Sequence, residues 1–185
     1  SDADYELAKK AFAAGALQIT HTFNAMPPML HRAPGIIGAA AENSAVFAEL
    51  ICDGLHVHES AVRAAFKLFG AERIILISDS IAPSGLADGD YQLDGRRVIV
   101  NGGRAVLDDG TIAGGTLTLL ESLKRAVAFH IPFEDALWAC TATPAKALGV
   151  FGEIGVIKQG AKADFLILDK ELELRAVYKD GNRIV

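Results

Sequence analysis

Residues 47–80, FAELICDGLHVHESAVRAAFKLFGAERIILISDS, have the pattern of a strand, a helix and a second strand. The segments 47–57 and 73–80 are strongly apolar, which is typical of strands that are buried on both faces. Between them, residues 59–70 carry apolar side chains at helical spacing and end at a glycine. This order predicts parallel strands joined by a helix, the unit of α/β folds.

The same alternation precedes this unit. Residues 2–15 predict a helix that is capped by Ser1 or Asp2, residues 16–23 a buried strand, and residues 24–35 a loop rich in proline and glycine. Residues 36–46 predict a helix or an irregular turn. The first helix has no strand ahead of it, so we expect the chain to be a piece of a longer protein.

The second half of the chain changes character. Residues 91–115 alternate with period two and contain Asp-Gly and Gly-Gly turns, which predicts short antiparallel strands. Helical patterns follow, the last one broken at Pro144, and the final segment again predicts three strands. We therefore expect two parts: residues 1–151, a catalytic α/β part built as a partial barrel or as a doubly wound sheet, and residues 152–185, a small β module.

Three polar side chains follow the predicted parallel strands, namely His21, His56 and Asp79. The carboxyl ends of parallel strands meet at the edge where α/β enzymes place their sites. Imidazole and carboxylate groups bind divalent cations and shuttle protons, so the trio indicates metal-assisted hydrolysis. Two other interpretations stay open at this point: a hydrogen-bonded structural role for each histidine, and capping by Asp79. For His58 we expect a capping or solvated role.

Composition narrows the class of protein. A chain of 185 residues with 51% hydrophobic and 22% charged residues predicts one globular domain, with an appendage at most. The net charge of −5 without a basic run argues against nucleic-acid binding. No apolar run reaches the roughly 18 residues that span a membrane. Cys52 and Cys140 stand in apolar contexts as expected for buried free thiols, which favours a reducing, cytoplasmic location.

Several motifs carry a resemblance to a known family. They are THTFNAMPPMLHRAPGIIGAA, ELICDGLHVH, ILISDSIAPSGLADGDYQLDG, TIAGGTLTLLESL and TPAKALGVFGEIGVIKQGAKADFLILD. In this order they resemble the N-acetylglucosamine-6-phosphate deacetylases of the amidohydrolase superfamily, over essentially the whole chain. The resemblance implies the C-terminal part of a (β/α)8 TIM-like barrel with part of a small β-sandwich. It also implies hydrolysis of N-acetylglucosamine 6-phosphate, a phosphorylated amino sugar, to acetate and glucosamine 6-phosphate.

The resemblance also implies roles for individual residues. His21 matches a ligand of one divalent metal ion, zinc in our expectation, with iron or manganese as alternatives, and Asp79 matches the catalytic carboxylate. The remaining matches are substrate-binding positions: Asn24, Ala25, Arg32, His56, Gly115, Thr116 and Leu117. Arg32 matches a phosphate-binding arginine that reaches the neighbouring subunit, which implies a homodimer.

The family's glutamate ligand and second histidine ligand lie upstream of the residues matched here. We therefore expect the 185 residues by themselves to bind metal weakly and to turn over little substrate. Two alternatives remain at this stage: another amidohydrolase, such as a deaminase or a cyclic amidase, or a non-catalytic fragment that acts as a scaffold.

Overall fold

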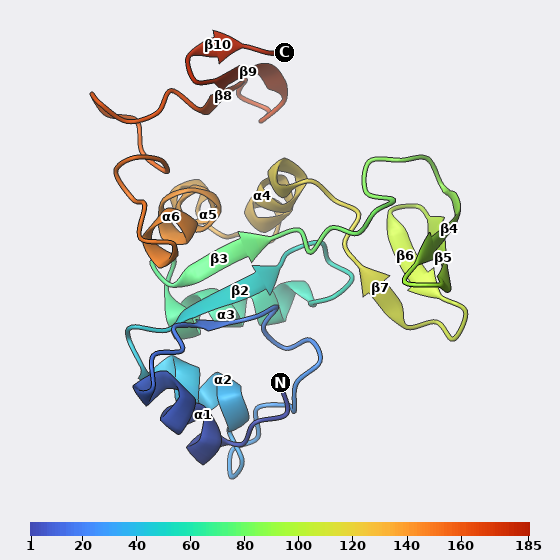
Figure 1. Cartoon of the computed structure of the whole chain (residues 1–185), viewed down its shortest axis with the longest axis vertical. Coiled ribbons are helices and arrows are strands. Elements are labelled where there is room, and N and C mark those ends of the chain that lie inside the picture. Colours follow the sequence, from blue (N-terminus) through green and yellow to red (C-terminus); the bar gives the residue numbers. More distant parts are fainter.

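Three separate β-sheets organise the chain, and the computed structural model describes all of residues 1–185. A parallel sheet lies at the centre with helices around it (Figure 1). A four-stranded antiparallel sheet lies to one side of it, and a three-stranded antiparallel sheet lies at the C-terminal end. The α/β class predicted from the alternating pattern is thereby confirmed.

The helices are α1 (Tyr5–Ala13), α2 (Gly35–Glu42), α3 (Glu59–Phe69), α4 (Leu119–Ala128), α5 (Phe133–Cys140) and α6 (Ala142–Ala147). The strands of the parallel sheet are β1 (Gln18–Ile19), β2 (Phe47–Ile51) and β3 (Ile74–Ile77). The four-stranded sheet contains β4 (Gly89–Leu93), β5 (Arg96–Asn101), β6 (Arg104–Leu107) and β7 (Ile112–Gly114). The last sheet contains β8 (Phe165–Leu168), β9 (Leu174–Lys179) and β10 (Asn182–Arg183).

The parallel sheet has the order β1-β2-β3, with Gln18 opposite Phe47 and Ala48 opposite Ile74. Helix α2 connects β1 to β2, and α3 connects β2 to β3, as the strand-helix-strand pattern predicts. All three strands run the same way, so their carboxyl ends share one edge. This edge is where the chemistry-bearing residues emerge.

The main core lies between this sheet and its helices. Leu50, Ile74 and Leu76 of the strands are each at most 2% exposed, and they cluster with Val62 and Phe66 of α3. Burying one such aliphatic side chain stabilises the fold by about 1.5–3 kcal/mol. The core therefore fixes the sheet, and with it the positions from which the edge loops leave.

Several element boundaries differ from the sequence predictions. Helix α1 is capped by Asp4, whose side chain accepts the Leu7 N–H at 2.8 Å, rather than by Ser1 or Asp2. The strand predicted over 16–23 is limited to Gln18–Ile19, because the backbone turns to positive φ at His21.

Other boundaries bear on the site and on the last helices. Strand β2 ends at Ile51, so His56 lies in a loop and does not directly end a strand. Pro144 lies inside the first turn of α6, where proline is tolerated, and the break comes earlier, at Thr141. The capping role expected for His58 is confirmed, since its Nδ1 accepts the Ser60 N–H at the start of α3.

Both antiparallel sheets match the predicted β segments. Strands β4 to β7 pair in chain order, and β9 lies between β8 and β10.

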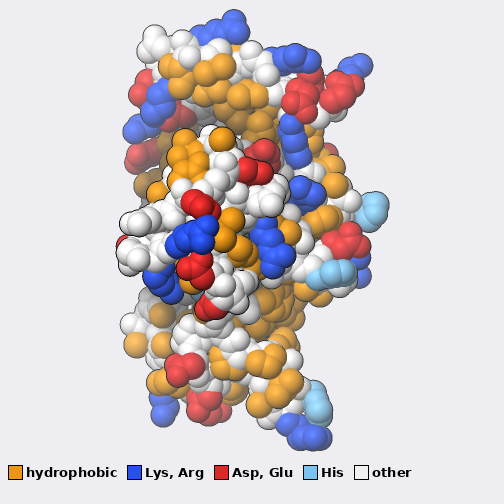
Figure 2. Space-filling model, turned by 90° about the vertical axis from the view of Figure 1, so that its right-hand side faces the viewer, with side chains coloured by type: hydrophobic (Ala, Val, Ile, Leu, Met, Phe, Trp, Pro, Cys, Tyr) orange, Lys and Arg blue, Asp and Glu red, His pale blue; other side chains and the backbone are white.

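Figure 2 shows basic and acidic side chains interspersed on one face of the molecule. Hydrophobic side chains gather near the top of this view, where Figure 1 places the last sheet. No helix combines the length and the apolar character needed to cross a membrane.

Candidate active site

His21 lies just beyond β1 in a strained backbone conformation. Its φ is 34°. Non-glycine residues adopt such values rarely and mostly where the surroundings enforce them. The carboxylate of Glu49 on β2 accepts the His21 N–H at 3.3 Å, and the Glu49 carbonyl accepts the Thr22 N–H at 2.8 Å. The His21 Nδ1 is buried without a hydrogen-bond partner in the chain. Buried polar atoms are nearly always paired, so this nitrogen has free capacity for a group outside the chain.

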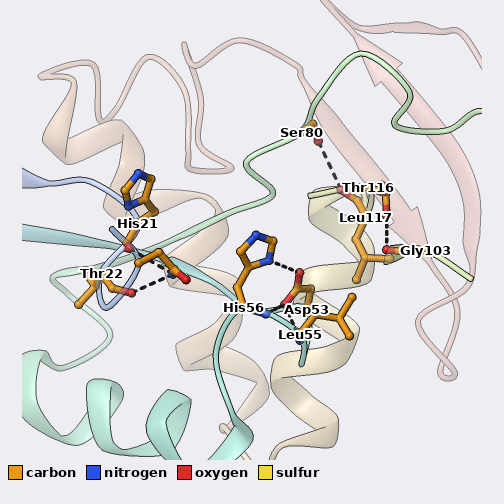
Figure 3. Close-up of polar contacts among 10 residues, drawn as sticks. His21, Thr22, Asp53, Leu55, His56, Ser80, Gly103, Thr116 and Leu117 are labelled. Atoms are coloured by element: carbon orange, nitrogen blue, oxygen red, sulfur yellow. Dashed lines mark hydrogen bonds and ion pairs between the residues drawn. The ribbon is translucent and has the colours of Figure 1, made fainter. Parts of the chain in front are cut away.

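His56 is held by Asp53, which the sequence analysis did not single out. The Asp53 Oδ2 lies 2.6 Å from the His56 Nδ1, and both side chains are less than a tenth exposed. Burial by itself would raise the pKa of Asp53, but hydrogen bonds from His56 and Leu55 outweigh burial and lower this pKa. Asp53 therefore stands as a carboxylate whose lone pairs are used by its own loop and by one imidazole (Figure 3).

Asp79 follows β3 by two residues and is exposed. Its φ is 48°, and the structure records no hydrogen bond to its carboxylate. The chain enters turns after Ser80, so no helix starts there for Asp79 to cap. The capping interpretation is thus not supported, and Asp79 presents a free carboxylate at the carboxyl edge of the sheet.

Gly115 holds the backbone beside Asp79. Its N–H donates to the Asp79 carbonyl at 2.8 Å, and its own carbonyl accepts the Ile81 N–H at 3.1 Å. A Cβ on Gly115 would lie 1.7 Å from the Ser78 carbonyl oxygen. Only glycine, which has no Cβ, allows this approach. The predicted substrate position Gly115 therefore has a clear structural role as well.

Thr116 and Leu117 are tied to neighbouring loops. The Thr116 hydroxyl donates to the Gly103 carbonyl at 2.5 Å, which fixes the turn between β5 and β6 (Figure 3). The Thr116 carbonyl accepts a hydrogen bond from the Ser84 hydroxyl at 2.9 Å. The Leu117 carbonyl accepts one from the Ser80 hydroxyl at 3.5 Å. The segment 114–118 is thus held rigidly next to Asp79.

The remaining predicted substrate residues lie in the loop after β1. The Asn24 side-chain amide donates to the carbonyls of His21 and Thr22, each at 3.3 Å, and so closes this loop on itself. Ala25 has a φ of 50°, and its carbonyl accepts from the N-terminal amine of Ser1 at 3.3 Å. Arg32 is exposed and forms no ion pair in the chain. Its guanidinium is therefore available to an anion.

The chain brings His21, His56 and Asp79 to loops that follow three adjacent parallel strands. It contains no cluster of three His, Cys, Asp or Glu side chains able to hold a metal ion. The unpaired Nδ1 of His21 is suited to act as one ligand of a metal ion, but this chain does not gather three possible ligands around it. A complete metal centre would need donors from elsewhere.

A cavity of about 410 Å³ lies beside this edge, between the Asp53 turn and the Gly102–Gly103 turn. Leu117 and Arg125 also line it, but His21 and Asp79 do not. Since His21, His56 and Asp79 do not line this cavity, we assign the candidate active site to the sheet edge and not to the cavity.

Thiol chemistry does not compete with the carboxylate. Both cysteines are free, and burial raises the pKa of the Cys52 thiol and of the Cys140 thiol to about 12. A thiol with such a pKa stays protonated near neutrality and is a poor nucleophile.

Asp53 and Glu49 hold residues of the candidate site, and the sequence analysis did not single them out. The dipeptide Asp53-Gly54 was a usable signal, because Asp-Gly marks a turn.

The chain is similar to one known protein family and to relatives from several organisms. The profile of the amidohydrolase family matches residues 1–184. The N-acetylglucosamine-6-phosphate deacetylase of Bacillus subtilis is 38% identical over 183 residues, which is 98% of this chain and 46% of that protein. The N-acetylgalactosamine-6-phosphate deacetylase of Escherichia coli O157:H7 is 34% identical over 182 residues, 98% of this chain and 48% of that protein.

A solved structure of a deacetylase also matches this chain. A mutant of the Mycobacterium smegmatis N-acetyl-D-glucosamine-6-phosphate deacetylase, in complex with N-acetyl-D-glucosamine-6-phosphate, superposes with a TM-score of 0.92 at 37% identity. The match covers 100% of this chain and 49% of that one. The chain thus spans about half the length of these relatives.

Proposed function

The chain belongs to the amidohydrolase family, and on this basis we propose that the enzyme containing it hydrolyses N-acetylglucosamine 6-phosphate to acetate and glucosamine 6-phosphate. The observation that carries the proposal is the free carboxylate of Asp79, on a fold that matches the sugar-phosphate complex with a TM-score of 0.92. The proposal concerns a longer enzyme, because the chain spans about half of its relatives.

Asp79 acts in this proposal as a general base and then as a general acid. Its carboxylate takes a proton from the attacking water and later passes it to the nitrogen of the scissile amide, which leaves as an amine. The absence of a hydrogen-bond partner in the chain leaves both carboxylate oxygens free for this exchange.

His21 and His56 serve binding roles. His21 would hold a divalent metal, zinc in our proposal with iron or manganese as alternatives, together with ligands that this chain does not contain. When bound, the metal would supply Lewis-acid activation of the reacting groups. His56 would contact the substrate next to the scissile amide.

The sugar and its phosphate would be held by the loops around the edge. Asn24, Ala25 and the rigid segment Gly115–Leu117 would line the sugar position. Arg32 would bind the phosphate, since a guanidinium is suited to bidentate contact with phosphate oxygens. Its exposure is compatible with reaching a neighbouring subunit, and we propose a homodimer on this ground.

The finer architecture is part of the same proposal. Residues 1–151 would form the C-terminal part of a (β/α)8 barrel, with β1 to β3 as consecutive barrel strands. Residues 152–185 would contribute strands β8 to β10 to a small β-sandwich. The parallel order with connecting helices and the separation of the last sheet support this division (Figure 1).

A second candidate substrate is N-acetylgalactosamine 6-phosphate, because the relative named for that substrate is 34% identical over nearly the whole chain. The two sugars differ only in the configuration of one hydroxyl group. The reaction and the role of Asp79 are the same in both cases.

The test measures acetate released by the enzyme containing this chain, supplied with zinc, iron(II) or manganese. We expect turnover of at least one of the two phosphorylated sugars and little turnover of unphosphorylated N-acetylglucosamine. Arg32→Ala should raise KM for the phosphorylated sugar about tenfold, a loss of about 1.4 kcal/mol in binding.

Arg96→Ala is the matched control, since Arg96 is also an exposed arginine without an ion pair. This variant should leave KM unchanged. Absence of acetate release with every metal and both sugars would reject the proposed reaction and favour a scaffold or another amidohydrolase.

A further inference from the structure

Asp53 and His56 form a buried pair beside the candidate active site. The carboxylate Oδ2 and the ring Nδ1 are 2.6 Å apart, and the side chains are 5% and 8% exposed. At this distance and burial, rotation of the imidazole would cost the full hydrogen bond and leave two buried polar groups unpaired. The ring therefore has one preferred orientation.

Asp53 is itself fixed by its loop. Its other oxygen, Oδ1, accepts the backbone N–H groups of Leu55 at 2.8 Å and His56 at 2.9 Å. These two bonds close the turn after β2, and they do not need Oδ2. Oδ1 of Asp53 thus stabilises the loop through two backbone hydrogen bonds, while Oδ2 contacts only the imidazole of His56.

The charge state of Asp53 determines the state of the ring. A carboxylate is an acceptor only, so the proton between the two groups must belong to the His56 Nδ1. The second ring nitrogen, Nε2, points away from Asp53 in Figure 3. In the neutral ring this Nε2 carries a lone pair, and in the protonated ring it carries a proton that can be donated.

We propose that Asp53 is a positioning residue for His56: it holds one proton on Nδ1 and aims Nε2 at the substrate. When the ring takes up a second proton from solvent on Nε2, the Asp53 carboxylate supplies the counter-charge to the imidazolium, whose Nε2–H donates to the amide oxygen. This inference rests on the proposed function, because it takes His56 as the residue at the scissile amide. Negative charge develops on the amide oxygen during attack, so a fixed donor there stabilises the transition state more than the ground state.

A purely structural role for Asp53 makes a different prediction. If Asp53 served only the turn, Asp53→Asn would be nearly silent, because the asparagine Oδ1 can accept the same two backbone N–H groups. The asparagine side-chain NH2, however, would donate to the His56 Nδ1. The ring would then have to accept at Nδ1 and carry its proton on Nε2.

The experiment compares the enzyme containing this chain with its Asp53→Asn variant by nitrogen NMR of the histidine rings, with His56→Gln to assign the signal. We expect protonated Nδ1 and unprotonated Nε2 in the neutral wild-type ring, and the reverse in Asp53→Asn. The kcat for acetate release should fall about 10- to 100-fold, as for other groups that orient a functional histidine, with little change in KM.

Two controls separate positioning from folding. Asp169→Asn is matched, because Asp169 also accepts two backbone N–H groups on one oxygen and pairs with a cation on the other. It should leave kcat unchanged. In the His56→Gln background, Asp53→Asn should cost nothing further, because a residue that acts only through His56 has no effect once His56 is gone.

The outcomes distinguish this inference from the proposed function. An unprotonated Nδ1 in the wild-type ring, or a full kcat in Asp53→Asn, would overturn the positioning role while the wild type still releases acetate. A wild type that releases no acetate would reject the proposed reaction, whatever the NMR spectrum shows about the pair.

Discussion

Strands β3 and β8 are similar in sequence but differ in their surroundings. Ile74–Ile77 reads IILI and is followed two residues later by Asp79, whereas Phe165–Leu168 reads FLIL and is followed directly by Asp169. Three of the four β3 residues are buried, while Leu166 and Ile167 in the middle of β8 are 48% and 44% exposed. An apolar strand is therefore not enough to predict where the core lies.

The two aspartates differ in the same way. The Asp169 carboxylate accepts the Glu171 and Glu173 N–H groups and pairs with Arg175, and the Glu173 bond foremost lowers the pKa of Asp169. The Asp79 carboxylate has no recorded partner. One carboxylate is used by its own turn, and the other is available to a ligand. Hydrogen-bond satisfaction, rather than position after a strand, distinguishes the two roles.

The largest expected difference is between the two variants that each remove the charge of one of these aspartates. Asp79→Asn should lower kcat for acetate release by about 10²–10⁴-fold, the range for a general acid-base group. Asp169→Asn should leave kcat unchanged and lower the melting temperature slightly, because it removes only the surface ion pair with Arg175. Both variants are measured with the same metal and sugar. Equal activity losses in the two variants would remove the functional distinction between these carboxylates.

The next effect tests burial in the two strands. Ile74 is 0% exposed. Ile74→Ala should therefore cost about 2–5 kcal/mol of unfolding free energy through lost contacts and a cavity. Ile167→Ala should cost less than about 1 kcal/mol, as for most exposed positions. Urea denaturation of the 185-residue chain by itself gives both values, because in the longer enzyme the proposed β-sandwich would cover part of β8. A cost at Ile167 as large as at Ile74 would mean that another protein segment covers β8 in solution.

Local sequence signals predicted much of this fold. The alternating strands and helices, the α3 helix with its Gly70 stop, and the capping role of His58 all depend on neighbours within a few residues. The predicted end of β1 was wrong, because the positive φ values at His21 and Phe23 depend on contacts with β2 rather than on residue type.

The candidate site was predictable to a lesser degree. The location of Asp79 beyond β3 follows from strand periodicity, but its lack of a partner does not. The pairing of His56 with Asp53 was missed because the strand was extended through Cys52, Leu55 and Val57, although the turn at Asp53 ends it at Ile51. Side-chain direction in such a loop is set by hydrogen bonds that sequence spacing alone does not specify.

The smallest expected effect concerns the glycine that holds Asp79, a contact that has no counterpart at Asp169. In Gly115→Ala the new Cβ would lie 1.7 Å from the Ser78 carbonyl oxygen, so the backbone around Asp79 must shift. We expect a loss of about 1–3 kcal/mol in unfolding free energy, typical of overpacking. We also expect a fall in kcat beyond any loss of folded protein, because the carboxylate moves with its backbone.

Gly89→Ala is the control for this change, since the nearest atom to its Cβ, on Tyr91, is 3.9 Å away and its φ is not positive. It should change neither kcat nor the unfolding free energy, the latter by no more than about 0.5 kcal/mol. If Gly115→Ala behaved like Gly89→Ala in both measurements, the close approach between the two loops would not hold Asp79. The orientation of that carboxylate would then have to come from groups outside this chain, and the contrast with the self-contained turn of Asp169 would become sharper still.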